Sequence, residues 1–396
     1  MRTELLAPAG DLERAKTAIV YGADAVYFGG RQFSLRARAS NFSLEDIREA
    51  AEFAHQHGSR VYVTVNMIPH NSDFEGLEDY LKKLEEYGVD AIICASRAIM
   101  AMCRSAAPKL EVHISTQQTS TNSQAVSYWQ QRGADRVVLG REVDYENLKT
   151  IMSRAEVPIE VFIHGGMCAN YSGRCTISNL LTNRDANRGG CAQSCRWNYH
   201  LYHGDQLLDR EEYLLSLGSR DMAAPDYLER LLRLNVASLK IEGRMKTAYY
   251  LANVIKAYRF LIDRYYNKGE ISEQDLAYGR SLLARVANRP TYDGFYGGLD
   301  PESQIYNLPS QVSQNYVASV ADYRNGMGLL ETRNFYQKGD RLALMNPQGE
   351  DISFRVERMM DEDGSEVTVA NKPMQRLWVK LPAEADRYSF IKMSED

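Results

Sequence analysis

The chain has no run of about 18 uncharged apolar residues, the length that a helix needs to cross a bilayer, and no low-complexity tract. Its N-terminal stretch, MRTELLAPAGDLERA, carries acids and a proline where a secretory signal would need an apolar run. We therefore expect a cytoplasmic protein with no membrane partner. The formal net charge of −5 argues against non-specific coating of nucleic acid, although it leaves room for a local basic patch.

A repeating order of apolar run, polar loop and amphipathic segment fills the first part of the chain. In one amphipathic segment, Ser43 is placed to cap a helix with Asp46 at its third position, and Gly58 ends it. Eight such units predict a (β/α)8 TIM-like barrel, with a doubly wound open sheet as the alternative. No G-x-G-x-x-G follows the first run, which disfavours dinucleotide binding. The apolar runs are residues 5–7, 25–28, 61–65, 91–94, 112–115, 137–139, 159–163 and 238–241.

The pattern along the chain also predicts the domain organisation. The barrel domain is expected at residues 1–290, with a cysteine-rich insertion at 165–219 after the seventh strand. Gly, Pro and Asp are frequent in residues 291–314, which we interpret as a linker. From about residue 315 to 396 the apolar period changes to two and turn dipeptides separate the runs, which predicts a small β-barrel domain.

Four of the six cysteines lie within residues 160–198 at a C-x6-C-x15-C-x3-C spacing. In a reducing compartment, clustered cysteines indicate metal ligands rather than disulfides. Thiolates select zinc, copper(I) or iron-sulfur clusters. The loose spacing favours a 4Fe-4S cluster over structural zinc, which usually takes close C-x2-C pairs, and zinc stays the alternative. The predicted ligands are Cys168, Cys175, Cys191 and Cys195, whereas Cys94 and Cys103 are interpreted as core residues.

Polar residues follow several predicted strands at their carboxyl ends, where barrel enzymes place their chemistry. We expect some of them to bind substrate or move protons, and others to close hydrogen-bond networks at the barrel rim. His113, His164 and Glu242 are the candidates for proton transfer. The others are Asn66, Ser115, Gln117, Arg141, Glu142, Lys240 and Arg244.

Basic residues are concentrated in two loops that the barrel would bring to the same end. The cysteine segment carries Arg174, Arg184, Arg188 and Arg196 against the single acid Asp185, and residues 31–38 carry Arg31, Arg36 and Arg38. Arginine binds phosphates and carboxylates through paired N–H groups, so the loops predict an anionic substrate or an RNA backbone. Aromatic side chains that could stack on a base are Phe33, Tyr171, Trp197 and Tyr199.

The segment EVFIHGGMCANYSGRCTIS, together with ELLAPAGD, GADAVYFGG, VYVTVN, HISTQ, NRGGCAQSCRW and SLKIEGRMK, resembles the collagenase-like peptidase family, family thirty-two of the unassigned peptidases. The resemblance covers nearly the whole chain. It includes a C-terminal domain that resembles domain 2 of translation elongation factors.

The resemblance implies an activity other than proteolysis. Members of this family act as oxygen-independent hydroxylation proteins with a 4Fe-4S cluster, and this chain most resembles the branch that forms 5-hydroxyuridine at the tRNA wobble position with prephenate. Resemblance implies that Cys168, Cys175, Cys191 and Cys195 hold the cluster. The same resemblance makes tRNA and a small carboxylate the expected partners. Other branches hydroxylate a ribosomal RNA cytidine or quinone precursors, and the oligomeric state is not predicted.

Proteolysis is the alternative class of function. His113 and Ser115 lie two residues apart on a predicted strand and therefore point the same way, but the sequence identifies no third group to orient them. There is also no H-E-x-x-H zinc motif. A non-catalytic module that binds RNA or transfers clusters is a third hypothesis.

Overall fold

The computed structural model describes residues 2–34, 41–208, 214–299, 304–306 and 315–394. It divides into two compact units. The first contains Met1–Leu283 and Arg289–Ser310, and the second contains Ala284–Asn288 and Gln311–Asp396. Among the described residues, no helix is both long and apolar enough to cross a membrane.

Eight parallel strands form a closed barrel in the first unit. The last of them, β13, pairs with β1 on one side and with β7 on the other, which closes the ring. This confirms the predicted TIM-like barrel and excludes the open sheet. The strands are β1 (Glu4–Pro8), β2 (Ala25–Gly29), β3 (Arg60–Val65), β4 (Ala91–Cys94), β5 (Glu111–Ile114), β6 (Arg136–Val138), β7 (Ile159–Gly165) and β13 (Ser238–Ile241).

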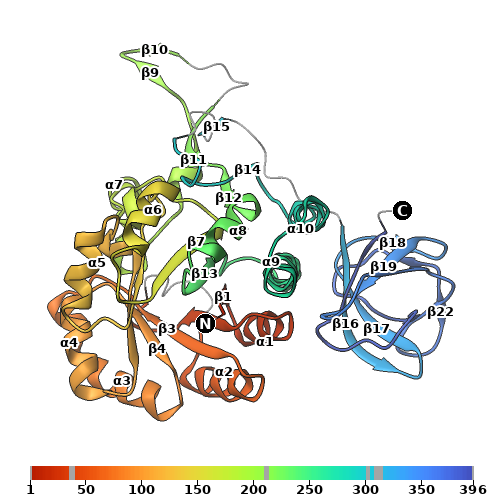
Figure 1. Cartoon of the computed structure of the whole chain (residues 1–396). Helices are drawn as coiled ribbons and strands as arrows, with labels where there is room; N and C mark the ends of the chain where they lie inside the picture. The colour runs from red at the N-terminus through yellow and green to blue at the C-terminus, as the bar shows by residue number, and fades with distance from the viewer. Residues whose placement is uncertain (1, 35–40, 209–213, 300–303, 307–314, 395–396) are drawn as a thin grey trace. The chain divides into compact units, whose positions relative to one another are not determined.

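Helices between the strands cover the outside of the barrel (Figure 1). The predicted helix cap is present, because Ser43 and Asp46 form a reciprocal capping box at the start of α2. Gly58 follows α2 with φ of +73°, a conformation that glycine adopts without strain. The helices are α1 (Leu12–Val20), α2 (Leu44–Gln56), α3 (Leu77–Glu86), α4 (Arg97–Ala106), α5 (Ser123–Gln130), α6 (Tyr145–Met152), α8 (Leu228–Arg233), α9 (Ala248–Lys268) and α10 (Glu273–Ala284).

The long excursion between β7 and β13 carries the cysteines and several short elements. Its first part contains the short helices η3 (Tyr171–Gly173), α7 (Ile177–Thr182), η4 (Ala186–Arg188) and η5 (Ser194–Arg196). The Gly204-Asp205 pair in the sequence predicts a hairpin turn, and the hairpin forms as β9 (Tyr202–His203) and β10 (Gln206–Leu207). Strands β8 (Asn198–Tyr199) and β11 (Leu215–Ser219) pair antiparallel with each other.

The sequence DMAAPDYLERLLRLN predicts a helix that begins at Asp221, and the structure differs at its first residues. Residues Asp221–Ala223 instead form β12, which adds antiparallel to the end of β7, and the helical turn η6 starts only at Pro225. The free edge of β7 beyond the barrel offers hydrogen-bond partners that outweigh the helical pattern of this stretch.

Part of the stretch expected to be a linker pairs with the barrel unit. Strand β14 (Thr291–Tyr292) lies parallel to β12, and β15 (Gln304–Tyr306) lies antiparallel to β11. Between them, Tyr296 is buried and donates its hydroxyl hydrogen to the backbone oxygen of Phe162 at 2.7 Å. These residues therefore pack against the end of β7 and belong to the barrel unit.

The second unit is an antiparallel sheet, as the period of two predicts. Asn325 and Gly326 both have positive φ in the turn between β16 and β17, which is the geometry of a tight hairpin. Its inner face packs Val317, Leu330 and Leu377 into a separate core. The sheet strands are β16 (Tyr316–Arg324), β17 (Met327–Thr332), β19 (Arg341–Met345), β20 (Ile352–Arg355), β21 (Met359–Met360), β22 (Glu366–Val367), β24 (Arg376–Lys380) and β25 (Phe390–Met393), and β18 (Tyr336–Gln337) pairs with β23 (Val369–Ala370).

Candidate active site at the cysteine segment and barrel mouth

The four predicted ligands are free thiols that lie within range of one another's charge. Burial raises the pKa of the Cys195 thiol, Arg196 lowers it, and the other three thiols of the segment raise it further. Burial likewise raises the pKa of Cys168, although the residue has an exposed side. The fold therefore places cysteines that are up to 27 positions apart within one another's electrostatic influence.

Side chains from the barrel hold the cysteine segment in place. Glu142, just after β6, accepts hydrogen bonds from the backbone nitrogen and the hydroxyl of Ser172 at 2.5 and 3.0 Å. Arg188 donates two hydrogen bonds to Asp73 at 2.7 and 3.0 Å. Within the segment, the Asn187 amide donates to the Cys175 carbonyl at 3.0 Å. Arg188, which the sequence predicts to bind an anionic substrate, therefore already pairs with the Asp73 carboxylate in the connection between β3 and α3.

The donor chemistry of the segment fits a thiolate-bound metal group. Four soft ligands come from one short stretch, and Arg141 and Arg196 lie close enough to lower the pKa of Cys168 and Cys195 respectively. Within the part of the chain that the structure describes, no three His, Cys, Asp or Glu side chains converge as a ready metal site.

A cavity of about 350 Å³ opens beside Cys168. This volume is within the range of about 300–1,000 Å³ that small-molecule sites occupy. Aromatic and polar groups both face the cavity, which would suit a flat polar ring. It is lined by Arg141, Glu142, Asp144, Met167, Cys168, Ala169, Asn170, Tyr171, Gly173, Phe295, Gly298 and Leu299.

Other predicted residues form a hydrogen-bonded group after β3 and β5. Asn66 donates to the Gln117 side-chain oxygen at 2.9 Å, and the Ser115 hydroxyl donates to the same oxygen at 3.1 Å. Arg174, from the cysteine segment, donates to Gln118 at 3.3 Å. The structure therefore brings Asn66, Gln117 and Arg174 to the mouth of the barrel.

Glu242 also lies at the mouth, immediately after β13. It accepts a hydrogen bond from the Tyr27 hydroxyl at 3.3 Å and pairs with Arg141 at 3.6 Å. Arg141 in turn lies 3.7 Å above the Phe162 ring and lines the cavity. Glu242 is thus one side chain away from the cavity beside Cys168.

The remaining predicted cations have different surroundings. Arg244 is buried and donates to Ser34 at 3.3 Å and to Asn41 at 2.9 Å. Arg196 donates to the Met167 carbonyl at 3.0 Å. The predicted substrate-binding residues Arg36 and Arg38 lie outside the described residues.

His164 points away from the barrel mouth. Its two ring nitrogens lie 3.0 Å from the Tyr250 hydroxyl and 3.3 Å from the Tyr258 hydroxyl, both on α9. Burial lowers the pKa of His164 to about 3, so the ring is neutral at physiological pH. The reason is a register shift, because Lys240 pairs with Phe162 and Ile241 with His164, which skips one residue of β7.

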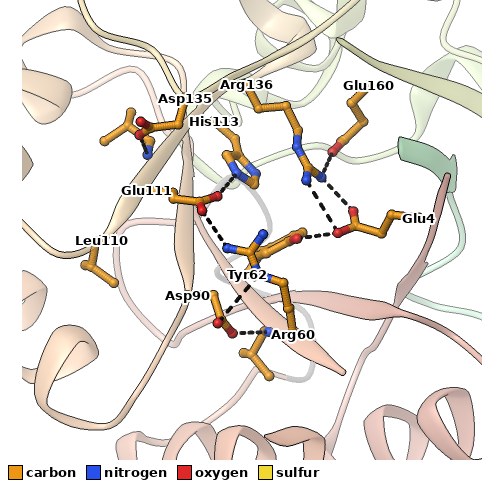
Figure 2. Close-up of polar contacts among 12 residues, drawn as sticks. Glu4, Arg60, Tyr62, Asp90, Leu110, Glu111, His113, Asp135, Arg136 and Glu160 are labelled. Carbon is orange, nitrogen blue, oxygen red and sulfur yellow. Dashed lines mark hydrogen bonds and ion pairs between the residues drawn. The ribbon is translucent and has the colours of Figure 1, made fainter. Parts of the chain in front are cut away.

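His113 and Lys240 lie in a charged network inside the barrel, near the amino ends of the strands. Figure 2 shows His113 beside Glu111, at 3.0 Å, and Arg136 between Glu4 and Glu160. Lys240 donates to Glu160 at 2.7 Å. The structure thus separates these two residues from the mouth, and their predicted catalytic and binding roles gain no support from their position.

The chain matches two family models. Peptidase family U32 matches residues 10–305, and the peptidase family U32 C-terminal domain matches residues 312–392. The chain belongs to peptidase family U32. This family is the one that the sequence blocks resemble, so the resemblance is confirmed.

Relatives within family U32 carry different names. The chain is 41% identical to tRNA hydroxylation protein P1 of Bacillus subtilis, covering 96% of this chain and 92% of that protein. It is 39% identical to the 23S rRNA 5-hydroxycytidine C2501 synthase of Escherichia coli, covering 66% of this chain and 39% of that protein. It is 31% identical to Collagenase of Porphyromonas gingivalis, covering 91% and 90% of the two chains.

Two features of the site did not emerge from the sequence. Phe295 belongs to the stretch interpreted as a linker, yet it lines the cavity. Asp221 was placed in a helix, yet it lies in β12 among cations of the cysteine segment and β13–α9 connection. The aromatic and Gly residues around Phe295 could have indicated that this stretch packs against the barrel, because an interdomain linker seldom contains large buried rings.

The interior network predicts a specific loss of stability in acid. Burial by itself would raise the pKa of Glu160, but Lys240 and Arg136 outweigh it and hold that pKa at about 2. The pKa of a glutamate in the unfolded chain is about 4.3. The Glu160 carboxylate therefore stabilises the fold fully above that pH, and its contribution is lost as the pH falls towards 2. In Glu160→Gln we expect a lower free energy of unfolding at neutral pH. We also expect this free energy to fall less steeply than in the wild type when urea unfolding is measured from pH 7 down to about 2.5. If the free energy of unfolding of the variant falls with acid as steeply as that of the wild type, Glu160 does not cause the loss of stability.

Proposed function

We propose that this protein hydroxylates tRNA, forming 5-hydroxyuridine at the wobble position with the aid of a 4Fe-4S cluster. The observation that carries the proposal is the cavity of about 350 Å³ beside Cys168, in a chain that is 41% identical to a tRNA hydroxylation protein over nearly its full length. Its RNA partner implies a reaction in the cytoplasm.

The cavity would receive a single uridine that is turned out of the anticodon loop. Tyr171 and Phe295 line it and would stack on the base, while Arg141 and Glu142 would contact its polar edge. Tyr171 is 59% exposed, so it is available at the entrance. Arg174 would contact an RNA phosphate next to the entrance.

Cys168, Cys175, Cys191 and Cys195 would hold the cluster, with zinc as the alternative metal. When bound, a cluster supplies electron transfer or activation of substrate at the cavity wall. Among the three groups predicted for proton transfer, we propose Glu242, because it alone is at the mouth and paired with the cavity residue Arg141. Prephenate is the proposed carboxylate ligand, as the family resemblance implies.

A peptidase function receives less support from the geometry. The Ser115 hydroxyl donates to Gln117, and His113 contacts Glu111 instead of the serine. Among the described residues, this pair therefore does not form a nucleophile and base in contact. Hydroxylation of a ribosomal RNA cytidine is the competing substrate, since one relative is named for that reaction.

The decisive experiment is mass spectrometry of nucleosides from tRNA and ribosomal RNA of a strain without this gene. We expect 5-hydroxyuridine derivatives to disappear from tRNA and to return with the wild-type gene, while ribosomal 5-hydroxycytidine stays constant. Intact tRNA modification with loss of the cytidine product would assign the ribosomal substrate. If both products persist, hydroxylation of RNA is ruled out.

Removing an aromatic wall of the cavity should weaken binding of the base. We expect Tyr171→Ala and Phe295→Ala each to lower tRNA hydroxylation roughly 10-fold or more, since stacking contributes about 1–3 kcal/mol per base. Iron content should not change. The control is Phe335→Ala, which removes a 58% exposed ring in the second unit. Equal activities of all three variants would show that the base binds elsewhere.

A further inference from the structure

The excursion after β7 carries a hairpin arm, which we define as residues 197–208 and 214–219. At its base β8 pairs with β11, and at its tip β9 pairs with β10. Figure 1 shows β9 and β10 extending beyond the rest of the barrel unit. Large apolar side chains of the arm are between 39% and 57% exposed, and these are Trp197, Leu201, Tyr202, Leu207, Leu208 and Leu217.

Both faces of the tip of the arm are apolar and exposed. Tyr202 lies opposite Leu207 in the antiparallel register, so the two side chains share one face. Leu208 follows Leu207 directly and therefore points to the other face. Within the described part of the chain, β9 and β10 pair with no third strand. A two-stranded hairpin is marginally stable in water by itself, so this tip lacks the covering that such a hairpin normally needs.

The charge of the arm indicates which kind of partner would cover it. Residues 197–208 contain neither lysine nor arginine, and their single acid is Asp205 at the turn. RNA binding depends on lysine and arginine contacts to phosphates, and anionic membrane surfaces attract basic segments. An exposed apolar surface without such cations fits an uncharged apolar protein surface instead.

A second copy of this chain presents such a surface, because the arm is complementary to itself. Two arms carry the same uncharged apolar side chains, so only the Asp205 turns would repel each other. Antiparallel strands of identical chains can pair across a two-fold axis, where each copy makes the same contacts with the other. Pairing of two arms would turn a two-stranded hairpin into a four-stranded sheet, which is large enough to be stable.

The exposed apolar area of the arm matches a weak dimer interface. Six large side chains, each about half exposed, present roughly 500 Å². Two copies would therefore bury roughly 1,000 Å² together, which is at the lower end of the range for specific interfaces. An interface of this size gives a reversible dimer whose population rises with protein concentration.

We propose that the hairpin arm joins two copies of this chain into a two-fold symmetric dimer, through contacts between the arms that centre on Tyr202 and Leu207. The inference goes beyond the proposed function and depends neither on the tRNA substrate nor on the bound metal. Because the arm begins two residues after Cys195, the interface would adjoin the cysteine segment.

The test is sedimentation velocity of the anaerobically purified full-length protein over a range of concentrations. We expect an equilibrium between monomer and dimer. Tyr202→Lys and Leu207→Lys should each weaken association at least 10-fold, because each would place a charge in an apolar contact. Both side chains are exposed in the single chain, so neither substitution removes core packing. The control is Ile352→Lys, at a 39% exposed strand position of the second unit, which should associate like the wild type.

Copurification of two differently tagged copies from one strain shows whether the partner is the same chain. The wild-type copies should copurify, and copies that both carry Leu207→Lys should not. A wild type that stays monomeric at every concentration overturns the proposal, and so does a dimer that both arm variants leave intact. A monomeric wild type that binds phosphatidylcholine vesicles, with binding lost in both arm variants, would assign the arm to a membrane surface instead. None of these outcomes alters the nucleoside assay, so the two proposals fail separately.

Discussion

Cys191→Ser is expected to lose both bound iron and tRNA hydroxylation. Cys191 is exposed, so serine at this position opens no cavity in the core, and a loss of function would report on ligation rather than on folding. A serine hydroxyl is a much poorer ligand than a thiolate for the soft metals that cysteine selects. The measurement is iron and sulfide analysis with visible absorption after anaerobic purification, followed by the nucleoside assay in a complemented strain.

The matched control for this experiment is a cysteine outside the segment. Cys94 is buried in β4, and burial raises the pKa of its thiol to about 12, which keeps it protonated and unsuited to bind metal. Cys94→Ala should therefore retain iron, sulfide and activity. A colourless wild-type protein with bound zinc would falsify the 4Fe-4S assignment. Retention of a full cluster in Cys191→Ser would remove Cys191 from the ligand set.

Arg136→Ala is expected to cause a large loss of stability, because it breaks the ion-pair network in the barrel interior. Arg136 donates to Glu4 at 2.6 Å and to Glu160 at 3.1 Å, and its side chain is only 8% exposed. Its removal leaves two carboxylates inside the barrel without their shared cation. Breaking a buried ion pair in this way costs about 3–5 kcal/mol. Urea unfolding followed by circular dichroism measures the change in the free energy of unfolding.

The control for Arg136 is an arginine with similar partners but a different environment. Arg280, on α10, pairs with Asp226 and Glu273, and its side chain is 44% exposed. Water screens these charges, so Arg280→Ala should cost at most about 1 kcal/mol. The contrast isolates burial as the cause. If both variants shift the urea midpoint equally, the interior network does not contribute as argued.

The sequence alone determined the architecture of the barrel and the position of the cysteines along it. The apolar runs predict all eight barrel strands to within two residues at each end, and Ser43 predicts the capping box that the structure contains. These features follow from local chemistry, since strand burial, helix caps and turn glycines each depend on a few adjacent residues. The blocks around the cysteines also identified family U32, which the family models confirm.

The direction of individual side chains was decided only by the tertiary structure. His113 and Lys240 looked like mouth residues, but the alternation along β5 and β13 places them in the interior network with Glu111 and Glu160. His164 contacts α9 because β7 pairs with β13 through a register shift. A shift of one residue reverses which face of a strand points into the barrel and which points to the surrounding helices, and no local pattern shows where it occurs.

The sequence likewise did not predict the contacts between segments that lie far apart along the chain. Phe295 reaches the cavity beside Cys168, and Arg289 reaches Asp221, because β14 adds to the sheet through β12. Sequence patterns report how each stretch satisfies its own backbone and apolar face. They do not report which free strand edge a later stretch will pair with, and in this protein that pairing builds the wall of the candidate site.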